Sequence, residues 1–159
     1  AAPPPPMAPT AAVHQPIGAT NYKHVPLFQG MSDIQITALI NQAQTVTKEP
    51  GQIVFEEGMT EDTLFLLQMG RCDVAHAGRT IATLGAGTVF GEMALVSDRP
   101  RSATIKAERL CTLKVWDSDT LHMMFDIDPE IGMLLYRNLG KILAQRLYRA
   151  NVDKRNAGR

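Results

Sequence analysis

The middle of the chain alternates short apolar runs with glycine-bearing turns. Between residues 45 and 117, runs rich in Val, Ile, Leu and Thr are separated by turns such as Pro50-Gly51 and Met69-Gly70. Runs of this length bounded by such turns are typical of β-strands. Because the connections are too short for crossover helices, we expect the strands to pair antiparallel in a closed or sandwich-like structure. The pattern predicts eight strands, at residues 45–48, 52–56, 63–69, 71–76, 79–84, 88–90, 102–107 and 110–116.

Helical patterns flank this β region on both sides. On the N-terminal side, Ser32 and Gln35 form a capping-box sequence ahead of an apolar helical face. On the C-terminal side, Asp117 is expected to cap a short helix, and Asp128, followed by a proline, to cap a longer one. The apolar stripe of the longer helix would pack on the strands or support a homodimer. Its members are Ile131, Leu134, Leu135, Leu139, Ile142, Leu143 and Leu147.

The two ends of the chain differ from this middle part. Residues 1–20 are rich in Pro and Ala and show no apolar periodicity, which predicts an extended linker or tail. Basic residues gather towards the other end, where residues 151–159 are expected to form a basic C-terminal tail. The predicted domain therefore spans residues 21–150.

Composition and charge argue against several classes of protein. Sixteen basic and sixteen acidic residues give a formal net charge of zero, which disfavours a nucleic-acid-binding surface over the whole chain. No run approaches 18 apolar residues, so we expect no membrane span and a cytoplasmic protein, or a cytosolic domain of a larger one. Cys72 and Cys111 have no zinc-like spacing and are expected to be reduced core residues.

Catalytic and metal-binding motifs are missing from the sequence. It contains no G-x-S-x-G motif, no Walker-type loop and no H-x-H pair followed by a glutamate. The histidines lie in different predicted elements, at His14, His24, His76 and His122. We therefore predict no enzyme, no metal site and no cofactor.

Two charged residues lie among small and apolar neighbours where the β pattern is interrupted. Glu92 belongs to the segment 91–98, which is expected to form a short helix, and Arg101 follows at the edge of another half-apolar run. Burying such charges costs free energy unless a partner compensates them. The two side chains could pair with each other, or they could bind a ligand.

A ligand with a phosphate and a sugar hydroxyl fits these residues. The first N–H groups of a helix beginning at Gly91 would bind an anion, and glycine lets the anion approach closely. The planar fork of Arg101 suits a phosphate, whereas Glu92 would accept a hydrogen bond from a hydroxyl. Ser102 adds a hydroxyl directed towards the phosphate or the base. A ribose phosphate carries all of these groups, but spacing alone leaves the ion pair between Glu92 and Arg101 equally open.

The residues around this site also resemble a known family. Residues 90–107, FGEMALVSDRPRSATIKA, are similar to the phosphate-binding cassette of cyclic nucleotide-binding domains, and are called the cassette below. That family includes the catabolite activator protein, regulatory subunits of cAMP-dependent protein kinase and cyclic-nucleotide-gated channels. The resemblance extends over residues 24–150. It implies a mainly β fold, an eight-stranded antiparallel, jelly-roll-like β-roll with an N-terminal helical segment, a short cassette helix and two C-terminal helices.

The resemblance also implies a role for individual residues. Glu92 would bind the ribose 2′-hydroxyl and Arg101 the cyclic phosphate. A residue of the last helix would cover the base, and the candidates are Leu143, Arg146 and Leu147; alternatively the leucines pack on the strands and Arg146 is solvated. The other residues that the resemblance places around the sugar phosphate are Gly91, Met93, Ala94, Ser102 and Ala103.

The function implied by the resemblance is reversible binding of a cyclic nucleotide by a regulatory sensor module. Serine at position 102 is intermediate between the threonine and alanine of cGMP- and cAMP-preferring members, and we favour cAMP over cGMP. Binding would shift the C-terminal helices relative to the strands. The alternative is an interaction module of the same fold that binds no nucleotide. A homodimer or an attached effector domain would complete the sensor.

Overall fold

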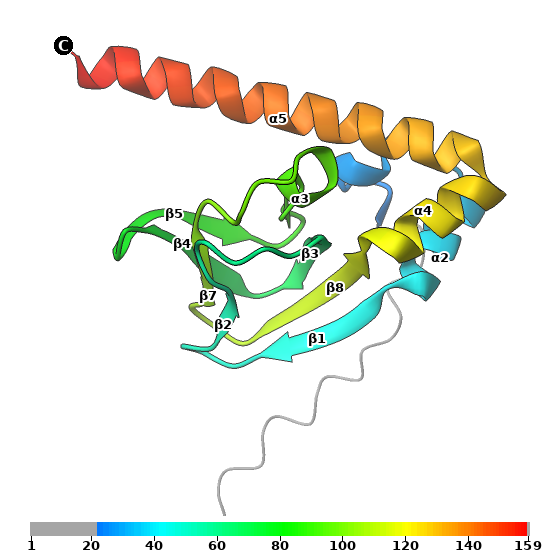
Figure 1. The fold of residues 1–159 in the computed structure, drawn as a ribbon, viewed down its shortest axis with the longest axis horizontal. Helices are drawn as coiled ribbons and strands as arrows, with labels where there is room; N and C mark the ends of the chain where they lie inside the picture. Colours follow the sequence, from blue (N-terminus) through cyan, green and yellow to red (C-terminus); the bar gives the residue numbers. More distant parts are fainter. Residues whose placement is uncertain (1–21, 159) are drawn as a thin grey trace, which may run out of the picture.

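The computed structural model describes residues 22–158, so the predicted linker at residues 1–20 lies outside the described residues. A short 3₁₀ helix, η1 (Pro26–Phe28), and helix α2 (Asp33–Gln42) precede the strands. The capping box at the start of α2 is confirmed, because Ser32 Oγ accepts from the Gln35 N–H and Gln35 Oε1 accepts from the Ser32 N–H. Two further helices follow the strands and lie across one side of the β-structure (Figure 1).

All eight predicted strands are present, and they form two four-stranded antiparallel sheets rather than a closed barrel. The first sheet has the order β1 (Gln44–Lys48), β8 (Cys111–Asp117), β3 (Thr63–Met69), β6 (Val89–Phe90). The second has the order β2 (Ile53–Phe55), β7 (Thr104–Ala107), β4 (Arg71–His76), β5 (Arg79–Gly85). The short helix α3 (Met93–Val96) interrupts the strands where the sequence predicted it. The chain thus has the expected β-roll with flanking helices.

The core has two parts, one inside the roll and one beneath the helices. Inside the roll, Phe65 and Phe90 stack with ring centroids 5.2 Å apart, and Phe55 packs against both rings. Beneath the helices, the fully buried Trp116 packs edge-on against Phe28 and donates from Nε1 to the Leu39 carbonyl over 2.7 Å. The first part therefore supports the cassette, and the second fixes the helices to the sheets.

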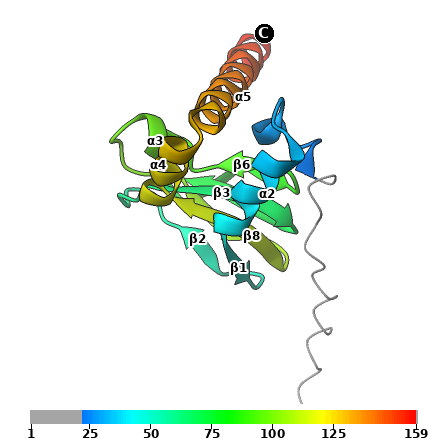
Figure 2. The ribbon, with the colours of Figure 1, turned by 90° about the vertical axis from the view of Figure 1, so that its right-hand side faces the viewer.

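Helix α4 (Ser118–Ile127) and helix α5 (Pro129–Ala157) are capped by Asp117 and Asp128, as predicted. Asp117 accepts from the Thr120 N–H, and this bond lowers the pKa of the Asp117 carboxyl. Figure 2 shows that α5 extends away from the sheets towards its C-terminal end. Residues 151–157 of the predicted basic C-terminal tail continue this helix.

The apolar stripe of α5 packs on its own domain over the first half of the helix. Its buried members are Ile131, Leu134, Leu135 and Leu139, whereas Leu147 is 64% exposed. Most of the stripe is thus used within the domain, and the homodimer stays a prediction.

A buried polar side chain joins α5 to the N-terminal segment. Asn138 is 1% exposed, and its Nδ2 donates to the Leu27 carbonyl at 2.7 Å and to the Gln29 carbonyl at 2.9 Å. One side chain thereby satisfies two main-chain acceptors beside η1 and fixes how α5 lies on the domain.

Replacing Asn138 should therefore destabilise the domain. We expect Asn138→Ala to lower the free energy of unfolding by about 2 kcal/mol, because two carbonyls lose their donor. Urea unfolding followed by the fluorescence of Trp116, the only tryptophan, measures the change. Asn151→Ala removes an exposed amide from the same helix and should change the free energy by less than about 0.5 kcal/mol. Equal effects of the two substitutions would contradict this role of Asn138.

Candidate functional site

Within the cassette, strand β6 is followed by a turn that requires glycine. Gly91 directly follows Phe90 and has φ of +79°, a conformation that residues with a side chain rarely adopt. The sequence placed the start of the short helix at Gly91, but the helix begins two residues later, at Met93, with Glu92 at its N-cap. Gly91 thus forms the turn, and Glu92 immediately precedes α3.

Gly91 is also in close contact with Arg101. A Cβ atom at Gly91 would lie 2.8 Å from Arg101 Nη1 and 2.8 Å from the Thr63 carbonyl oxygen. The absence of a side chain lets the guanidinium lie directly against the backbone, where Nη1 donates to the Gly91 carbonyl over 3.0 Å. The turn and the placement of the arginine therefore depend on the same glycine.

Arg101 is buried and strongly fixed in position. It is 7% exposed, its Nη2 donates to both the carbonyl and the hydroxyl oxygen of Thr63 at 2.9 Å, and its Cζ lies 4.2 Å from the centre of the Phe55 ring. Burial lowers the pKa of the guanidinium, while the nearby carboxylates of Glu61 and Glu92 act to raise the pKa. Its buried Nε–H has no acceptor within the described part of the chain. The buried guanidinium therefore keeps one donor that the described residues leave unsatisfied.

Glu92 has a different partner. It is 6% exposed, and its Oε1 accepts from Arg146 Nη1 over 2.5 Å. Arg146 also donates from Nη2 to the Val89 carbonyl, so this residue of α5 bridges Glu92 and the end of β6. Among residues 22–158, no ion pair joins Glu92 to Arg101. The ion pair between Glu92 and Arg101, which the sequence left open, is therefore not formed. Each of the two charges is compensated by other groups.

A cavity of about 550 Å³ lies in front of these charged groups. It brings together every residue that the sequence assigned to the sugar phosphate, namely Gly91, Glu92, Met93, Ala94, Arg101, Ser102 and Ala103. Of the three candidates for covering the base, Arg146 lines the cavity and Leu143 and Leu147 do not. Of these candidates, only Arg146 therefore lies at the site, where it contacts Glu92.

Other residues of the cavity wall were not found from the sequence. Arg99 and Arg149 are exposed arginines, and nothing in their sequence context separates them from other surface charges. The apolar wall could have been found in part, because alternate residues of a strand point to the same face. It is formed by Phe55, Val74, Ala82, Leu84, Phe90 and Ile105.

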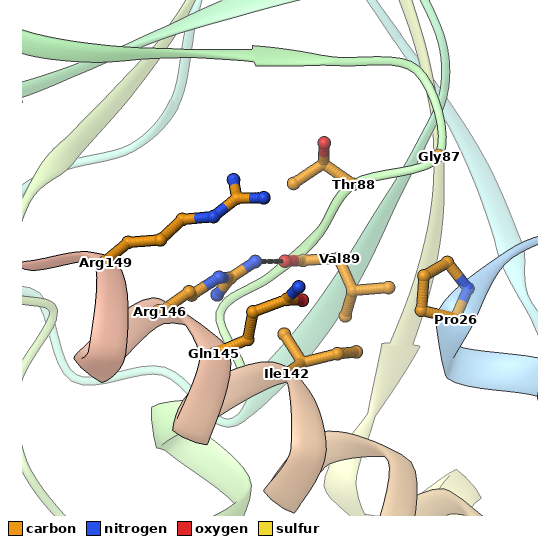
Figure 3. Close-up of a pocket in the computed structure, with 8 residues that line it drawn as sticks. All are labelled: Pro26, Gly87, Thr88, Val89, Ile142, Gln145, Arg146 and Arg149. Atoms are coloured by element: carbon orange, nitrogen blue, oxygen red, sulfur yellow. Dashed lines mark hydrogen bonds between the residues drawn. The ribbon is translucent and has the colours of Figure 1, made fainter.

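A second, smaller hollow of about 300 Å³ lies between α5 and residues 87–89. Arg146 and Arg149 line both hollows. Figure 3 shows Arg146 reaching the Val89 carbonyl, and the side chain of Arg149 extending beside Thr88. Since Gly91, Glu92 and Arg101 do not line this hollow, the larger cavity is the candidate site.

Within residues 22–158, no group of three or more His, Cys, Asp or Glu side chains is placed to hold a metal ion, and no helix has the length and apolar character to cross a membrane. Cys72 and Cys111 are buried and unbridged, with sulfur atoms 3.5 Å apart. Burial raises the pKa of the Cys72 thiol to about 12, which keeps it protonated and unreactive.

Comparison with known proteins identifies the family. The model of the cyclic nucleotide-binding domain matches residues 45–128. The chain is 34% identical over 88 residues to the cAMP-dependent protein kinase regulatory subunit of Yarrowia lipolytica, covering 54% of this chain and 24% of the relative. It is 38% identical over 84 residues to the cGMP-dependent protein kinase of Toxoplasma gondii, covering 53% of this chain and 8% of the relative. The chain thus spans less than a quarter of each relative's length.

A solved structure agrees with the sequence comparison. The catabolite activator protein of Thermus thermophilus superposes with a TM-score of 0.70 at 28% identity, over 80% of this chain and 61% of that one. Fold, cavity and sequence agree, and the chain belongs to the cyclic nucleotide-binding domain family. The domains of this family are regulatory nucleotide-binding domains and not catalytic domains.

The close contact at Gly91 gives a stability prediction. Gly91→Ala should cost about 1–2 kcal/mol more than Gly51→Ala, because both positions have positive φ but a Cβ at Gly51 meets no atom within 4 Å. The difference between the two variants in urea unfolding separates the close contacts with Arg101 and the Thr63 carbonyl from backbone strain. If both substitutions cost the same, these neighbours move aside freely and the close approach is unimportant.

Proposed function

We propose that the cavity binds a cyclic nucleotide reversibly, with cAMP preferred to cGMP, and that the chain acts as a regulatory sensor. The observation that carries this proposal is Arg101, a buried guanidinium on the cavity wall with a free Nε–H. A buried donor without an acceptor costs about 1–3 kcal/mol. A phosphate oxygen that accepts from this arginine would recover that free energy, and its negative charge would compensate the buried positive charge.

Glu92 supports a sugar hydroxyl as the second contact. A carboxylate near a phosphate is repelled unless a cation neutralises it, and Arg146 supplies that cation on Oε1. A carboxylate can accept several hydrogen bonds, so Oε2 remains to accept from the ribose 2′-hydroxyl. Arg101 and Glu92 would thus recognise two neighbouring groups of one ribose phosphate.

Ser102 supports the preference for cAMP only because it is a serine and not a threonine. It is exposed beside Arg101 and lines the cavity, and its hydroxyl would contact the phosphate. The threonine found in cGMP-preferring members carries an additional methyl group that this chain lacks. The alternative, a module of this fold that binds no nucleotide, would leave the buried Nε–H of Arg101 unsatisfied.

Removing Arg101 should therefore abolish tight binding. We expect Arg101→Ala to weaken the binding of cAMP and cGMP at least a hundredfold, about 2.7 kcal/mol, because the phosphate loses its charged partner. Arg101→Lys should restore only part of the affinity, since it keeps the charge without the fork. Glu92→Gln should cost less than Arg101→Ala, because an amide oxygen still accepts from the hydroxyl. Isothermal titration of the ligand-free protein measures all three.

The matched control for this series is Arg109→Ala, which removes an exposed arginine outside the cavity. It changes the net charge equally and should bind normally. The unfolding curve of each variant shows whether it is folded before titration. Absence of heat with both nucleotides from the folded wild-type protein would refute the sensor function. Normal binding by Arg101→Ala would refute the phosphate assignment alone.

We further propose that binding shifts the C-terminal helices, and that Arg146 couples α5 to the ligand. Arg146 holds Glu92 through Oε1 and the end of β6 through the Val89 carbonyl. When α5 is docked, Glu92 is neutralised and oriented for the ribose; when α5 moves away, the carboxylate is left uncompensated beside the phosphate. The nucleotide therefore binds the docked arrangement more tightly and increases its population. An attached effector domain would sense this change in α5.

Loss of Arg146 should weaken binding and uncouple the helix. We expect Arg146→Ala to bind cAMP about tenfold more weakly, a change of roughly 1.4 kcal/mol, because Glu92 loses its neutralising partner. Hydrogen exchange should show that cAMP protects the amides of α5 in the wild-type protein and much less in this variant. Lys141→Ala removes an exposed charge from the same helix and should change neither result. Tighter binding by Arg146→Ala would show that the arginine competes with the ribose and would contradict the coupling.

A further inference from the structure

A histidine and a glutamate that do not line the cavity connect strand β4 to the segment after strand β2. His76, the last residue of β4, has its Nδ1 2.9 Å from Glu57 Oε1. The other oxygen of this carboxylate, Oε2, accepts from the Ala77 N–H at 3.1 Å, in a turn where Ala77 has φ of +50°. Glu57 thus fixes both the end of β4 and the turn that follows it.

The same nitrogen of His76 also contacts the cassette. His76 Nδ1 lies 3.2 Å from the Ser102 carbonyl oxygen. An ionised carboxylate and a carbonyl only accept hydrogen bonds, which assigns the hydrogen to Nδ1 and leaves Nε2 as the nitrogen that gains or loses a proton. Within residues 22–158, Nε2 has no hydrogen-bond partner, and the side chain is 58% exposed. His76 can therefore take up a proton without breaking either contact.

The main chain beside Ser102 is held by the segment that carries the glutamate. The Gly58 N–H donates to the Arg101 carbonyl, and the Arg101 N–H donates to the Met59 carbonyl, both at 2.8 Å. His76 adds a donor to the next carbonyl along the chain, that of Ser102. The backbone that carries the proposed phosphate contacts is thus fixed from outside the cavity.

We propose that Glu57 and His76 position the C-terminal end of the cassette for the nucleotide, and that protonated His76 positions it more firmly than neutral His76. This assignment rests on the proposed function, because Arg101 and Ser102 line the cavity in which the nucleotide would bind. A charged imidazole is a stronger hydrogen-bond donor than a neutral one. The arrangement shown is therefore more populated when His76 is charged, and a ligand that fits this arrangement binds more tightly.

The groups around His76 determine the direction of the pH dependence. Glu57, at 2.9 Å, favours the charged imidazole. Arg79 is the register partner of His76 on β5 and opposes the charge, but within residues 22–158 it forms no ion pair or hydrogen bond with His76 or Glu57. Thr104, the β7 residue paired nearest to His76, is uncharged. Histidine changes its charge between about pH 5 and 8, so the affinity should rise as the pH falls through this range.

Isothermal titration with cAMP at about pH 6 and about pH 8, within the range in which histidine titrates, tests the proposal. We expect the wild-type protein to bind about threefold more tightly at the lower pH, a small factor because exposed ion pairs contribute little. The phosphodiester of cAMP keeps its single charge at both values. Titrations in two buffers of different ionisation enthalpy should also show that binding takes up part of a proton.

Substitutions at the two positions separate the hydrogen bond from the charge. His76→Asn keeps an N–H donor that does not titrate, so it should bind as the wild type does at about pH 8 and show neither the gain at lower pH nor proton uptake. His76→Ala should bind about threefold more weakly than His76→Asn at both pH values, because the Ser102 carbonyl loses its donor. Glu57→Gln should lose most of the gain. His24→Asn is the matched control: it removes an exposed histidine that lines neither hollow and should keep the wild-type profile.

Unfolding curves at both pH values show whether each variant is folded before titration. Equal affinity of the wild-type protein at the two pH values, without proton uptake, would refute the role of the charge. A wild-type pH profile in His76→Asn would assign the proton to another group, and equal binding by His76→Ala and His76→Asn would refute the positioning of Ser102. If the wild-type protein binds neither nucleotide at either pH, the proposed function itself fails, and this assignment fails with it.

Discussion

The buried guanidinium of Arg101 is the constraint on which the site depends. Taking an isolated cation out of water costs several kcal/mol. This chain compensates the charge with the carbonyls of Gly91 and Thr63, the ring of Phe55 and the Glu61 carboxylate, which lies 3.7 Å from Nη2. Gly91 must lack a side chain to let the guanidinium in. Phe55 is in turn held by Phe65 and Phe90 in the roll. The core packing and the binding chemistry are therefore parts of one arrangement.

The second charge at the site is compensated from a distant part of the chain. Glu92 is neutralised by Arg146, 54 residues further along, so the cassette is complete only while α5 is docked on the roll. Asn138 and the buried leucines of α5 keep the helix in place. The two opposite charges thus have different kinds of partner: Arg101 is held by groups of the roll, whereas Glu92 depends on a helix outside it.

Local patterns account for most of what the sequence predicted correctly. The eight strands, the capping box at Ser32 and the helix starts at Asp117 and Asp128 follow from turn residues and caps, which act within a few positions. The sequence named the residues of the cassette because they are contiguous and match a family pattern. Arg146 was named only as a candidate for covering the base, since its contact with Glu92 requires knowing how α5 crosses the roll. Arg149 also lines the cavity and was not named for the same reason: the position of a surface arginine relative to the site depends on the tertiary placement of its helix.

The length of α5 has a mechanical consequence. The helix is continuous from Pro129 to Ala157, and at 1.5 Å per residue its 29 residues extend roughly 43 Å. Near its start, Gly132 packs so closely on Phe125 of α4 that a Cβ would lie 3.0 Å from the ring, so the base of α5 is held against α4. In the proposed sensor this helix would act as a lever: a tilt of about 10° about its base would carry its far end roughly 7 Å, from that length. A small adjustment around Glu92 would thereby become a displacement large enough for another protein surface to detect.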